Sequence, residues 1–481
     1  MDSSLPRKIL YLKHCAVFKA VAERARIGET TFWRESLRSW IDCQEKAVVC
    51  ILATLVLAGR PGRGRVLMRT NHHVAGSSLE EWCVIRSADG HNRDTAWNLV
   101  VVATSLFLLM GSGCTKQDPY APPDLFYYFA SYKVGKNPTT VTPTDVNQDG
   151  FTDLVTTNIG SNTLSILLGN GDGTFRDQVQ LNVCKEPRSL ALGMFNRDSY
   201  PDVVLACSGG DEVAVLFGRA DGKFEEGPRY PVHRTPIAIA TDDLNGDQVP
   251  DLVVALRNDK IKVFLGTGTG EFTHGAQYEY GDTPTSVALA DLNGDGKIDL
   301  AVTNGGPMSN AVSIWMGNGD GTFRPPTDYR TGKRPLGVSF ADFNRDRIRD
   351  LLVINGVQDS FTTFLGKGNG TFHPGRDSGA DAGPNFGLAR DFNGDRRIDV
   401  AIVNLQSSDL SILFGRDDGT FEYPPRNYRT KPGPFALATF RVTTKEAEEP
   451  GLVTADNGNG SVSIFLHRGL KAVSAPVAPP P

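Results

Sequence analysis

A unit of about 49 residues repeats along most of this 481-residue chain, and this repeat limits what the chain can fold into. Its clearest element is the acidic motif D-x-N-x-D-x-x-x-D, followed by an aliphatic residue. Complete copies begin at Asp145, Asp243, Asp291, Asp342 and Asp391. An incomplete copy begins at Met194, and a seventh unit around Phe440 has lost the motif. A fixed period of this length is typical of architectures in which each repeat is one supersecondary unit.

Two further landmarks recur with the same period. One is G-x-G-x-G-x-F or a near variant, first seen at Gly169 to Phe175, and the other is a proline before each new unit. The residues between the landmarks read as short strands, because segments such as Thr285 to Ala290 alternate apolar and polar side chains. Four short strands per unit predict a β-propeller blade. Helical periodicity is absent from the repeats, which excludes helical solenoids. The prolines are Pro138, Pro187, Pro236, Pro284, Pro335, Pro384 and Pro434.

The two ends of the repeat region predict how the ring closes. The last unit ends at Gly469 after its third strand, while residues 126–138 match residues 323–335, which contain a fourth strand. We therefore expect an all-β, seven-bladed propeller over residues 126–469, in which Phe126 to Tyr132 pair with Ser461 to Leu466. This arrangement leaves no long exposed sheet edge.

The acidic motif predicts a calcium loop. Positions 1, 3, 5 and 9 offer side-chain oxygens and position 7 a backbone carbonyl, and Ca²⁺ prefers 6–8 oxygen ligands. The twelfth position, where an EF-hand needs Glu, holds residues such as Thr156 and Val254, so the ninth Asp would supply the second carboxylate clamp. The alternative is an Asx-rich turn without metal, but the packed carboxylates would then repel each other. The predicted ligands of about five Ca²⁺ sites are Asp145, Asn147, Asp149, Phe151, Asp153, Asp243, Asn245, Asp247, Val249, Asp251, Asp291, Asn293, Asp295, Lys297, Asp299, Asp342, Asn344, Asp346, Ile348, Asp350, Asp391, Asn393, Asp395, Arg397 and Asp399.

The sixth position of the motif differs between copies. It is Gly150 or Gly296 in two of them, and Gln248, Arg347 or Arg396 in the others. If this residue adopts a positive φ, copies without glycine should bind the metal more weakly.

With these motifs, residues 126–469 resemble the FG-GAP/VCBS repeat family, which includes the seven-bladed head of integrin α-subunits. The resemblance implies a Ca²⁺-stabilised propeller with its metal loops on one face. It also implies adhesion, lectin-like or scaffold roles, and usually export. A shared fold does not by itself identify a ligand.

No catalytic motif stands out. The chain has no G-x-S-x-G, H-E-x-x-H or P-loop sequence, and the histidines of the repeats fall at unequal positions in different units. We therefore expect a non-enzymatic module that binds protein or glycan, with a polysaccharide-cleaving propeller enzyme as the alternative. The net charge of −5 gives no electrostatic reason to expect a nucleic-acid partner.

The face opposite the acidic loops has its own recurring residue, five positions after the ninth Asp. It is Asn158, Asn304, Asn355 and Asn404 in four units. These residues are either structural turns or a ring of polar ligand groups near the central channel. The loops that follow, such as 305–310 and 356–360, differ in length and would carry specificity.

The N-terminal part of the chain differs in character from the repeats. We expect residues 1–95 to be a poorly structured or helical extension, or one that does not belong to the natural protein. In residues 96–114 an apolar run ends at Cys114, which resembles a bacterial lipoprotein signal. An ordinary signal, an uncleaved anchor or a buried helix are the alternatives. A lipoprotein signal implies that Cys114 is lipidated and that the protein lies at the outer membrane or cell surface. The alternative is export to the periplasm or the medium.

Three further expectations concern the linker, the tail and the cysteines. Residues 115–125 read as a linker, and the Pro/Ala-rich residues 470–481 as a disordered tail. Cys184 and Cys207 either pair in an oxidising compartment or remain buried free thiols.

Overall fold

The computed structural model describes residues 67–74, 77–84, 124–257, 259–279, 282–443 and 448–469. The chain divides into two compact units, Met1–Asp118 and Pro119–Pro481. In the first unit, β1 (Leu67–Val74) pairs antiparallel with β2 (Ser77–Val84), a hairpin that the sequence pattern did not predict. The predicted signal with Cys114 and the predicted tail lie outside the described residues. No helix in the described ranges is long and apolar enough to cross a membrane.

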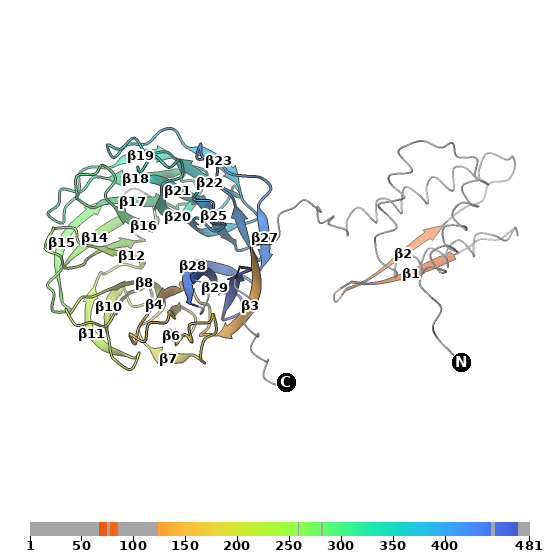
Figure 1. Ribbon diagram of the computed structural model, residues 1–481, viewed down its shortest axis with the longest axis horizontal. Helices are drawn as coiled ribbons and strands as arrows, with labels where there is room; N and C mark the ends of the chain where they lie inside the picture. The colour runs from red at the N-terminus through yellow and green to blue at the C-terminus, as the bar shows by residue number, and fades with distance from the viewer. Residues whose placement is uncertain are drawn as a thin grey trace, which may run out of the picture. The chain divides into compact units, whose positions relative to one another are not determined.

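The second unit is a ring of seven four-stranded antiparallel sheets, as predicted (Figure 1). Blades 1 to 6 each contain four strands that are consecutive in sequence. Blade 1 contains β4 (Thr142–Thr144), β5 (Asp153–Asn158), β6 (Thr163–Leu167) and β7 (Val179–Asn182), and blade 2 contains β8 (Pro187–Gly193), β9 (Asp202–Cys207), β10 (Glu212–Gly218) and β11 (Phe224–Pro231). Blade 3 contains β12 (Pro236–Asp242), β13 (Asp251–Leu256), β14 (Lys260–Gly266) and β15 (Phe272–Glu279), and blade 4 contains β16 (Pro284–Ala290), β17 (Asp299–Asn304), β18 (Ala311–Trp315) and β19 (Thr327–Arg330). Blade 5 contains β20 (Pro335–Ala341), β21 (Asp350–Asn355), β22 (Ser360–Phe364) and β23 (Arg376–Gly379), and blade 6 contains β24 (Pro384–Arg390), β25 (Asp399–Asn404), β26 (Asp409–Leu413) and β27 (Arg426–Arg429).

Blade 7 joins the two ends of the propeller. It contains β28 (Pro434–Thr443), β29 (Glu448–Asp456), β30 (Ser461–His467) and, as its fourth strand, β3 (Phe126–Lys133). The register places Phe126 opposite His467 and Tyr132 opposite Val462. The predicted closure by an N-terminal strand is therefore confirmed.

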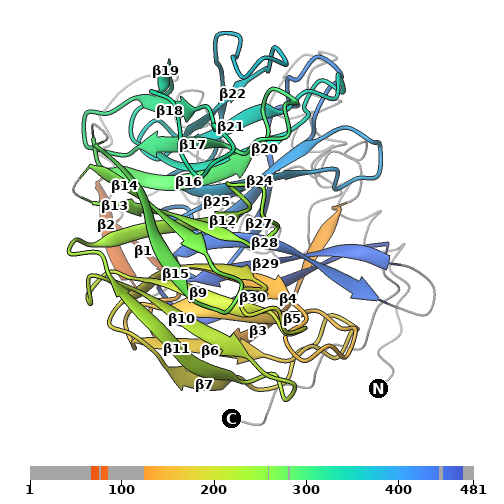
Figure 2. The same cartoon turned by 90° about the vertical axis from the view of Figure 1, so that its left-hand side faces the viewer.

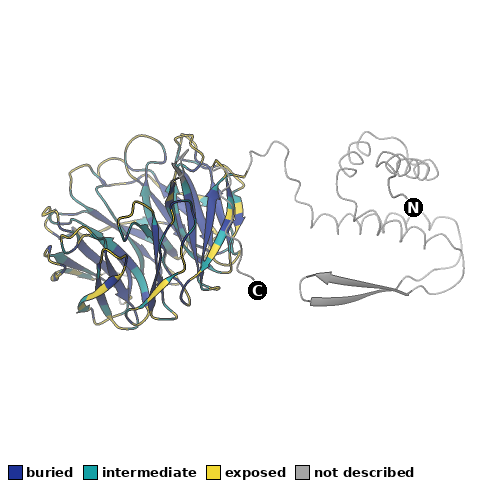
Figure 3. Ribbon diagram, turned by 60° about the horizontal axis from the view of Figure 1, so that its bottom comes forward, coloured by how far each residue is buried: buried dark blue, intermediate teal, exposed yellow. Residues whose placement is uncertain are grey.

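The core lies between the blades. Seven apolar clusters fill the seven spaces between neighbouring blades, including the one between blades 7 and 1. Every residue of the second strand is buried in blades 1 to 6, because a neighbouring blade covers each face of the sheet. The outer strands, such as β7, carry most of their side chains in solvent (Figure 3).

A tyrosine on the outer strand links several blades to the next blade. The Tyr329 hydroxyl of blade 4 accepts a hydrogen bond from the Phe372 N–H of blade 5 at 3.2 Å, and the two rings meet edge to face. In the closing blade, Tyr132 contacts Phe175 of blade 1 in the same way. Blades 7 and 1, where the ring closes, are thus linked in the same way as blades 4 and 5.

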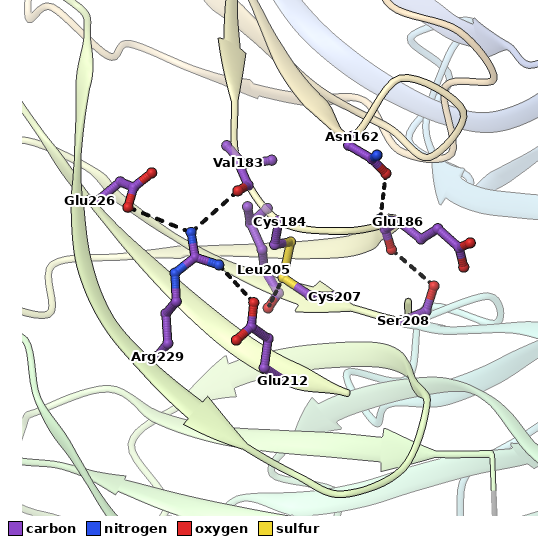
Figure 4. The surroundings of a disulfide bond; sticks show 10 residues. All are labelled: Asn162, Val183, Cys184, Glu186, Leu205, Cys207, Ser208, Glu212, Glu226 and Arg229. Atoms are coloured by element: carbon purple, nitrogen blue, oxygen red, sulfur yellow. Dashed lines mark hydrogen bonds and ion pairs between the residues drawn. A yellow bond between two sulfur atoms is a disulfide. The ribbon is translucent and has the colours of Figure 1, made fainter. Parts of the chain in front are cut away.

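Cys184 and Cys207 form a disulfide, which settles the alternative that the sequence left open (Figure 4). Cys184 follows the last strand of blade 1, and Cys207 ends β9 of blade 2. Both residues are buried. The bond therefore ties the connection between the two blades to the second strand of blade 2.

The recurring Asn residues on the face opposite the acidic loops are buried. Asn158 donates from Nδ2 to Ser165 Oγ at 2.8 Å, and Ser165 Oγ donates to Gln178 Oε1 at 2.6 Å. Asn355 and Asn404 make the equivalent bonds to the third strands of their blades. These side chains are parts of hydrogen-bond networks within the blades, so the alternative of a solvent-facing ligand ring is wrong.

Blade 7 has a carboxylate where these blades have Asn. Asp456 pairs with Pro434 as Asn355 pairs with Pro335. It accepts hydrogen bonds from the hydroxyls of Thr454 (2.8 Å) and Ser463 (2.6 Å). Burial raises its pKa to about 7, despite these hydrogen bonds and the opposing effect of Lys431.

This raised pKa predicts a pH-dependent stability. The unfolded pKa of Asp is about 3.9, so between about pH 4 and pH 7 the folded state binds more protons than the unfolded state. The free energy of unfolding should therefore fall as pH rises through this window and level off above it. Asp456→Asn should remove the share of this dependence that Asp456 contributes, and raise stability at pH 8 by on the order of 2 kcal/mol. Urea unfolding between pH 4 and pH 8 measures both effects.

The reverse substitution in blade 1 is the matched control. Asn158→Asp places a carboxylate in the same position, where Ser165 and Thr163 are its neighbours. It should introduce the loss of stability with rising pH that Asp456→Asn removes. If the free energy of unfolding changed with pH in the same way in the wild type and in Asp456→Asn, the raised pKa of Asp456 would be contradicted.

Candidate metal-binding loops

Each complete acidic motif connects the first and second strands of its blade. In blade 1 the loop lies between β4 and β5. Asp145 accepts hydrogen bonds from the N–H groups of Asp149 (3.1 Å) and Gly150 (2.9 Å), and Asp149 Oδ1 accepts one from Phe151 N–H at 2.9 Å. The short polar side chains thus fold the loop around their own oxygens, as Asx turns do.

The ninth Asp has a different environment from the first three polar positions. Asp153 is fully buried, and its carboxylate accepts hydrogen bonds from Val146 N–H (3.0 Å) and Gly169 N–H (2.7 Å). It therefore joins the acidic loop to the first glycine of G-x-G-x-G-x-F, which follows the third strand. The same two bonds recur at Asp202, Asp251, Asp299, Asp350 and Asp399.

These buried carboxylates are held near other negative charges. The pKa of Asp153 is raised to about 6, chiefly by burial and further by the charges of Asp149 and Asp145, while its two backbone hydrogen bonds oppose the shift. Burial is also the main reason why the pKa is raised to about 6 at Asp251, Asp350 and Asp399. A cation in the loop would relieve this repulsion.

The sixth position adopts the left-handed conformation in all five complete copies. Its φ is 85° at Gly150 and 77° at Gly296, and 64°, 68° and 68° at Gln248, Arg347 and Arg396. The expected positive φ is therefore confirmed, and the last three residues carry a backbone conformation that glycine adopts more readily. The weaker metal binding expected of their loops stays a prediction.

The donors of each loop suit a hard cation by their chemistry. Blade 1 offers the oxygens of Asp145, Asn147, Asp149 and Asp153 and the carbonyl of Phe151, with no sulfur or imidazole among them. Within the described ranges, no three His, Cys, Asp or Glu side chains converge in a metal-binding arrangement. In this structure the carboxylates accept N–H groups of the loop instead. The five Ca²⁺ sites thus stay a prediction, with a fitting donor set.

The incomplete copy shows which part of the motif the turn requires. The first position is Met194, whose side chain is 45% exposed. The second half of the loop is nevertheless kept: Tyr200 N–H donates to Asp198 at 2.8 Å, and Phe195 N–H donates to Asp202 at 3.0 Å. The first Asp is therefore dispensable for the fold of the loop.

Blade 7 replaces the loop by a longer hairpin. Phe440 pairs with Gly451 as Ala341 pairs with Asp350 in blade 5, so Arg441 stands where other blades have the first Asp, and Gly451 where they have the ninth. The pairing continues through Arg441–Pro450 to Thr443–Glu448. Figure 2 shows the resulting β28–β29 hairpin extending beyond the neighbouring strands.

A short cleft lies beside this hairpin, where blades 6, 7 and 1 meet. It encloses about 370 Å³ and is lined by Arg390 of blade 6, by Thr439 and Arg441 of blade 7, and by Thr144 and Asp145 of blade 1, among others. Sequence reasoning missed this cleft. The available signal was the basic residue at Arg441, in the place of an acidic one.

Comparisons with known proteins agree with this architecture. Residues 145–205, 195–254, 243–302 and 291–353 match the FG-GAP-like repeat. No curated protein matches the chain. The fold is similar to two crystal structures of BBS1N in complex with ARL6DN, soaked with lead (12% identity, TM-score 0.51) and with mercury (11% identity, TM-score 0.54). Each similarity covers 72% of this chain and 98% of the other chain.

At such low identity these similarities concern the fold alone. The repeat matches concern sequence, and they fall on four overlapping pairs of blades from β5 to β21. The propeller of this chain has seven blades, and its residues 145–353 consist of FG-GAP-like repeats.

Proposed function

We propose that this chain is an exported, surface-tethered propeller that is stabilised by Ca²⁺ and binds a ligand without catalysis. The FG-GAP-like propeller fold supports a binding-type module. The observation that carries the proposal is a set of exposed apolar side chains on one face of the ring. The metal, the compartment and the binding surface are supported by separate observations.

Calcium is supported by the crowding of oxygen ligands in five loops. In the loop of blade 4, Asp291 and Asp295 both lie close enough to Asp299 to raise its pKa, in addition to the effect of burial. A divalent cation held by Asp291, Asn293, Asp295, Asp299 and the Lys297 carbonyl would neutralise these charges. The Met194 loop and blade 7 lack part or all of the donor set, so we expect about five bound ions.

Removing calcium should lower the melting temperature. Extracellular modules bind Ca²⁺ with Kd of roughly 10⁻⁴–10⁻³ M, so about 1 mM Ca²⁺ contributes roughly 0.4–1.4 kcal/mol per site. Five such sites should shift the melting temperature by several degrees between Ca²⁺ and EDTA in calorimetry. Asp295→Ala should abolish one site, because it removes a central carboxylate.

Asp198→Ala in the incomplete loop is the control, and it should leave the calcium stoichiometry unchanged. An unchanged melting temperature in EDTA, with fewer than two calcium ions per chain by elemental analysis, would show that the loops are turns without metal.

Export is supported by the disulfide between Cys184 and Cys207, since such bonds persist in oxidising compartments. We infer that the mature chain begins at Cys114, which carries the lipid, and that the propeller is held at the outer membrane or cell surface. Mass spectrometry of the protein from its native host should find a lipid-modified N-terminus at this residue. An intact N-terminus upstream of residue 90 on an unanchored form would contradict the inference.

The binding surface is supported by loops on the face opposite the acidic motifs. Met308, Val357 and Leu405 lie in the loops between the second and third strands of blades 4, 5 and 6, and their side chains are 87%, 54% and 38% exposed. Three exposed apolar residues thus lie in equivalent loops of consecutive blades. We call Met308, Val357 and Leu405 the apolar arc, and we propose that these residues contact a protein partner.

Pull-down with the purified propeller tests this surface. A specific partner should bind the wild type and lose binding to the double variant Met308→Ser/Val357→Ser. Val179→Ser on the outer strand β7, whose side chain is 45% exposed, is the matched control and should retain binding. Equal binding by both variants would refute the role of the arc. Cleavage of a polysaccharide by the same preparation would favour the enzyme alternative.

A further inference from the structure

Two arginines lie at the same end of blades 2 and 3, on the face opposite the acidic loops. Arg188 is the second residue of β8, one of the inner strands around the centre of the ring (Figure 1). Arg257 directly follows β13, whose last residue, Leu256, pairs with Pro236 at the start of β12. Because β8 and β12 contact each other, the two arginines belong to adjacent inner ends of the blades.

Arg188 is the exception among the equivalent residues of the seven blades. In every blade, the residue after the recurring proline enters the inner strand, and only Arg188 is charged among the seven. These residues are Thr139, Arg188, Ile237, Thr285, Leu336, Asn385 and Phe435. Arg188 is half-buried, and a charged group that leaves water requires a compensating partner.

The charge of Arg188 lacks a direct partner in the part of the chain that the structure describes. There, neither the Arg188 nor the Arg257 guanidinium makes a side-chain hydrogen bond or an ion pair. Burial lowers the pKa of Arg188, the charge of Arg257 lowers it further, and Glu186 opposes the shift. The two guanidinium groups are therefore close enough to repel each other, and Glu186 acts on Arg188 only from beyond ion-pair distance.

The other charged residues nearby leave an excess of positive charge at this pair. Asp259 shares a loop with Arg257, but its carboxylate accepts a backbone N–H of the connection to blade 4 at 2.7 Å. Asp211, in the equivalent loop of blade 2, is offset by Arg234 before β12, and both side chains are exposed. The two arginines therefore favour an anion.

The arginine pair adjoins the loops that carry the apolar arc. Arg257 N–H donates to the carbonyl of Thr235 at 2.9 Å. Leu405 of the arc makes the same bond to Gly383 at 2.8 Å, so the two residues take equivalent places in blades 3 and 6. The loops after the second strands thus present a cation in blade 3 and exposed apolar side chains in blades 4 to 6.

We propose that the protein partner of the apolar arc places an Asp or Glu carboxylate against Arg188 and Arg257, next to apolar residues that contact the arc. The planar fork of a guanidinium matches the two oxygens of a carboxylate, and partial burial strengthens the pairing. Arg257 is exposed and attracts the carboxylate, while Arg188 holds it nearer the centre of the ring. This inference rests on the proposed protein-binding function and adds the chemistry of the partner.

Peptide selection tests this pairing without the natural partner. Phage that display random peptides of about 12 residues are selected in parallel on the full chain and on Arg188→Gln/Arg257→Gln, both in 1 mM Ca²⁺. Peptides selected on the wild type should be enriched in Asp or Glu beside apolar residues. Those selected on the double variant should keep the apolar residues and lose the acidic enrichment.

One acidic peptide from the wild-type selection, synthesised with a fluorescent label, then gives dissociation constants by anisotropy. Arg188→Gln and Arg257→Gln should each weaken its binding by about tenfold, as the loss of a charge-assisted hydrogen bond does. Added NaCl should weaken binding to the wild type more than binding to the double variant. Met308→Ser/Val357→Ser should weaken the same peptide through the arc.

Arg349→Gln is the matched control. Arg349 is exposed and lies in the acidic loop of blade 5, so this variant removes one charge from the opposite face and should bind the peptide as the wild type does. Arg188→Gln should not lower the melting temperature, because it removes a half-buried charge without a direct partner. A clear fall would show that Arg188 is bonded within the fold, and would overturn the pairing.

The outcomes separate this inference from the protein-binding function. A wild-type selection without acidic enrichment, or equal binding of the peptide by the folded double Gln variant, would overturn the pairing and leave the arc intact. Peptides that depend on neither the arginines nor the arc would overturn both. Arginine-dependent binding of vesicles that contain anionic phospholipid, without peptide binding, would also overturn the inference and assign the arginines to a membrane surface.

Discussion

The apolar character of both faces of each blade is the constraint on which the propeller depends. In β5, β13 and β21 every residue is buried, although these strands lie in the middle of separate sheets. A sheet of this kind cannot leave either face in water, so each blade requires a neighbour on both sides. Only a closed ring meets this requirement for all seven. β3 completes the last sheet, and an apolar cluster then fills the space between blades 7 and 1 as it does between the other blades.

Within a blade, the buried carboxylate of the ninth Asp is the main polar restraint. Asp350 accepts Phe343 N–H at 2.7 Å and Gly366 N–H at 2.7 Å, and so holds the acidic loop against the end of the third strand. Removing it would leave two buried N–H groups without partners. The first three polar positions lie at the exposed rim of the loop. The ninth Asp thus supports the fold of the loop in addition to its predicted role as a ligand, and Asp202 keeps both hydrogen bonds in the copy that has lost the first Asp.

The fold was predictable because its signals are local and repeated. Prolines such as Pro335 begin the inner strands, phenylalanines such as Phe323 mark the outer ones, and the match of Phe126 to Phe323 predicted the closure. Features that depend on contacts between distant residues were not predictable. To predict the pairing of Cys184 with Cys207, the strand registers of two blades would have to be known. The burial of Asn158 depends on the blades that flank it. Asp456 was missed because the seventh unit has lost the motif by which it could be aligned.

Blade 7 shows how a repeat can lose its motif without losing its place in the ring. Gly451 cannot make the two hydrogen bonds of a ninth Asp, and the paired backbone of Arg441 to Thr443 holds the hairpin instead. Val442, on that extension, is buried in the cluster between blades 7 and 1, which adds apolar contact at the seam. Because the hairpin no longer requires an acidic residue at its first position, a cation can stand there. Blade 7 is therefore the unit in which the charge at the first position of the motif is reversed, from Asp to Arg441.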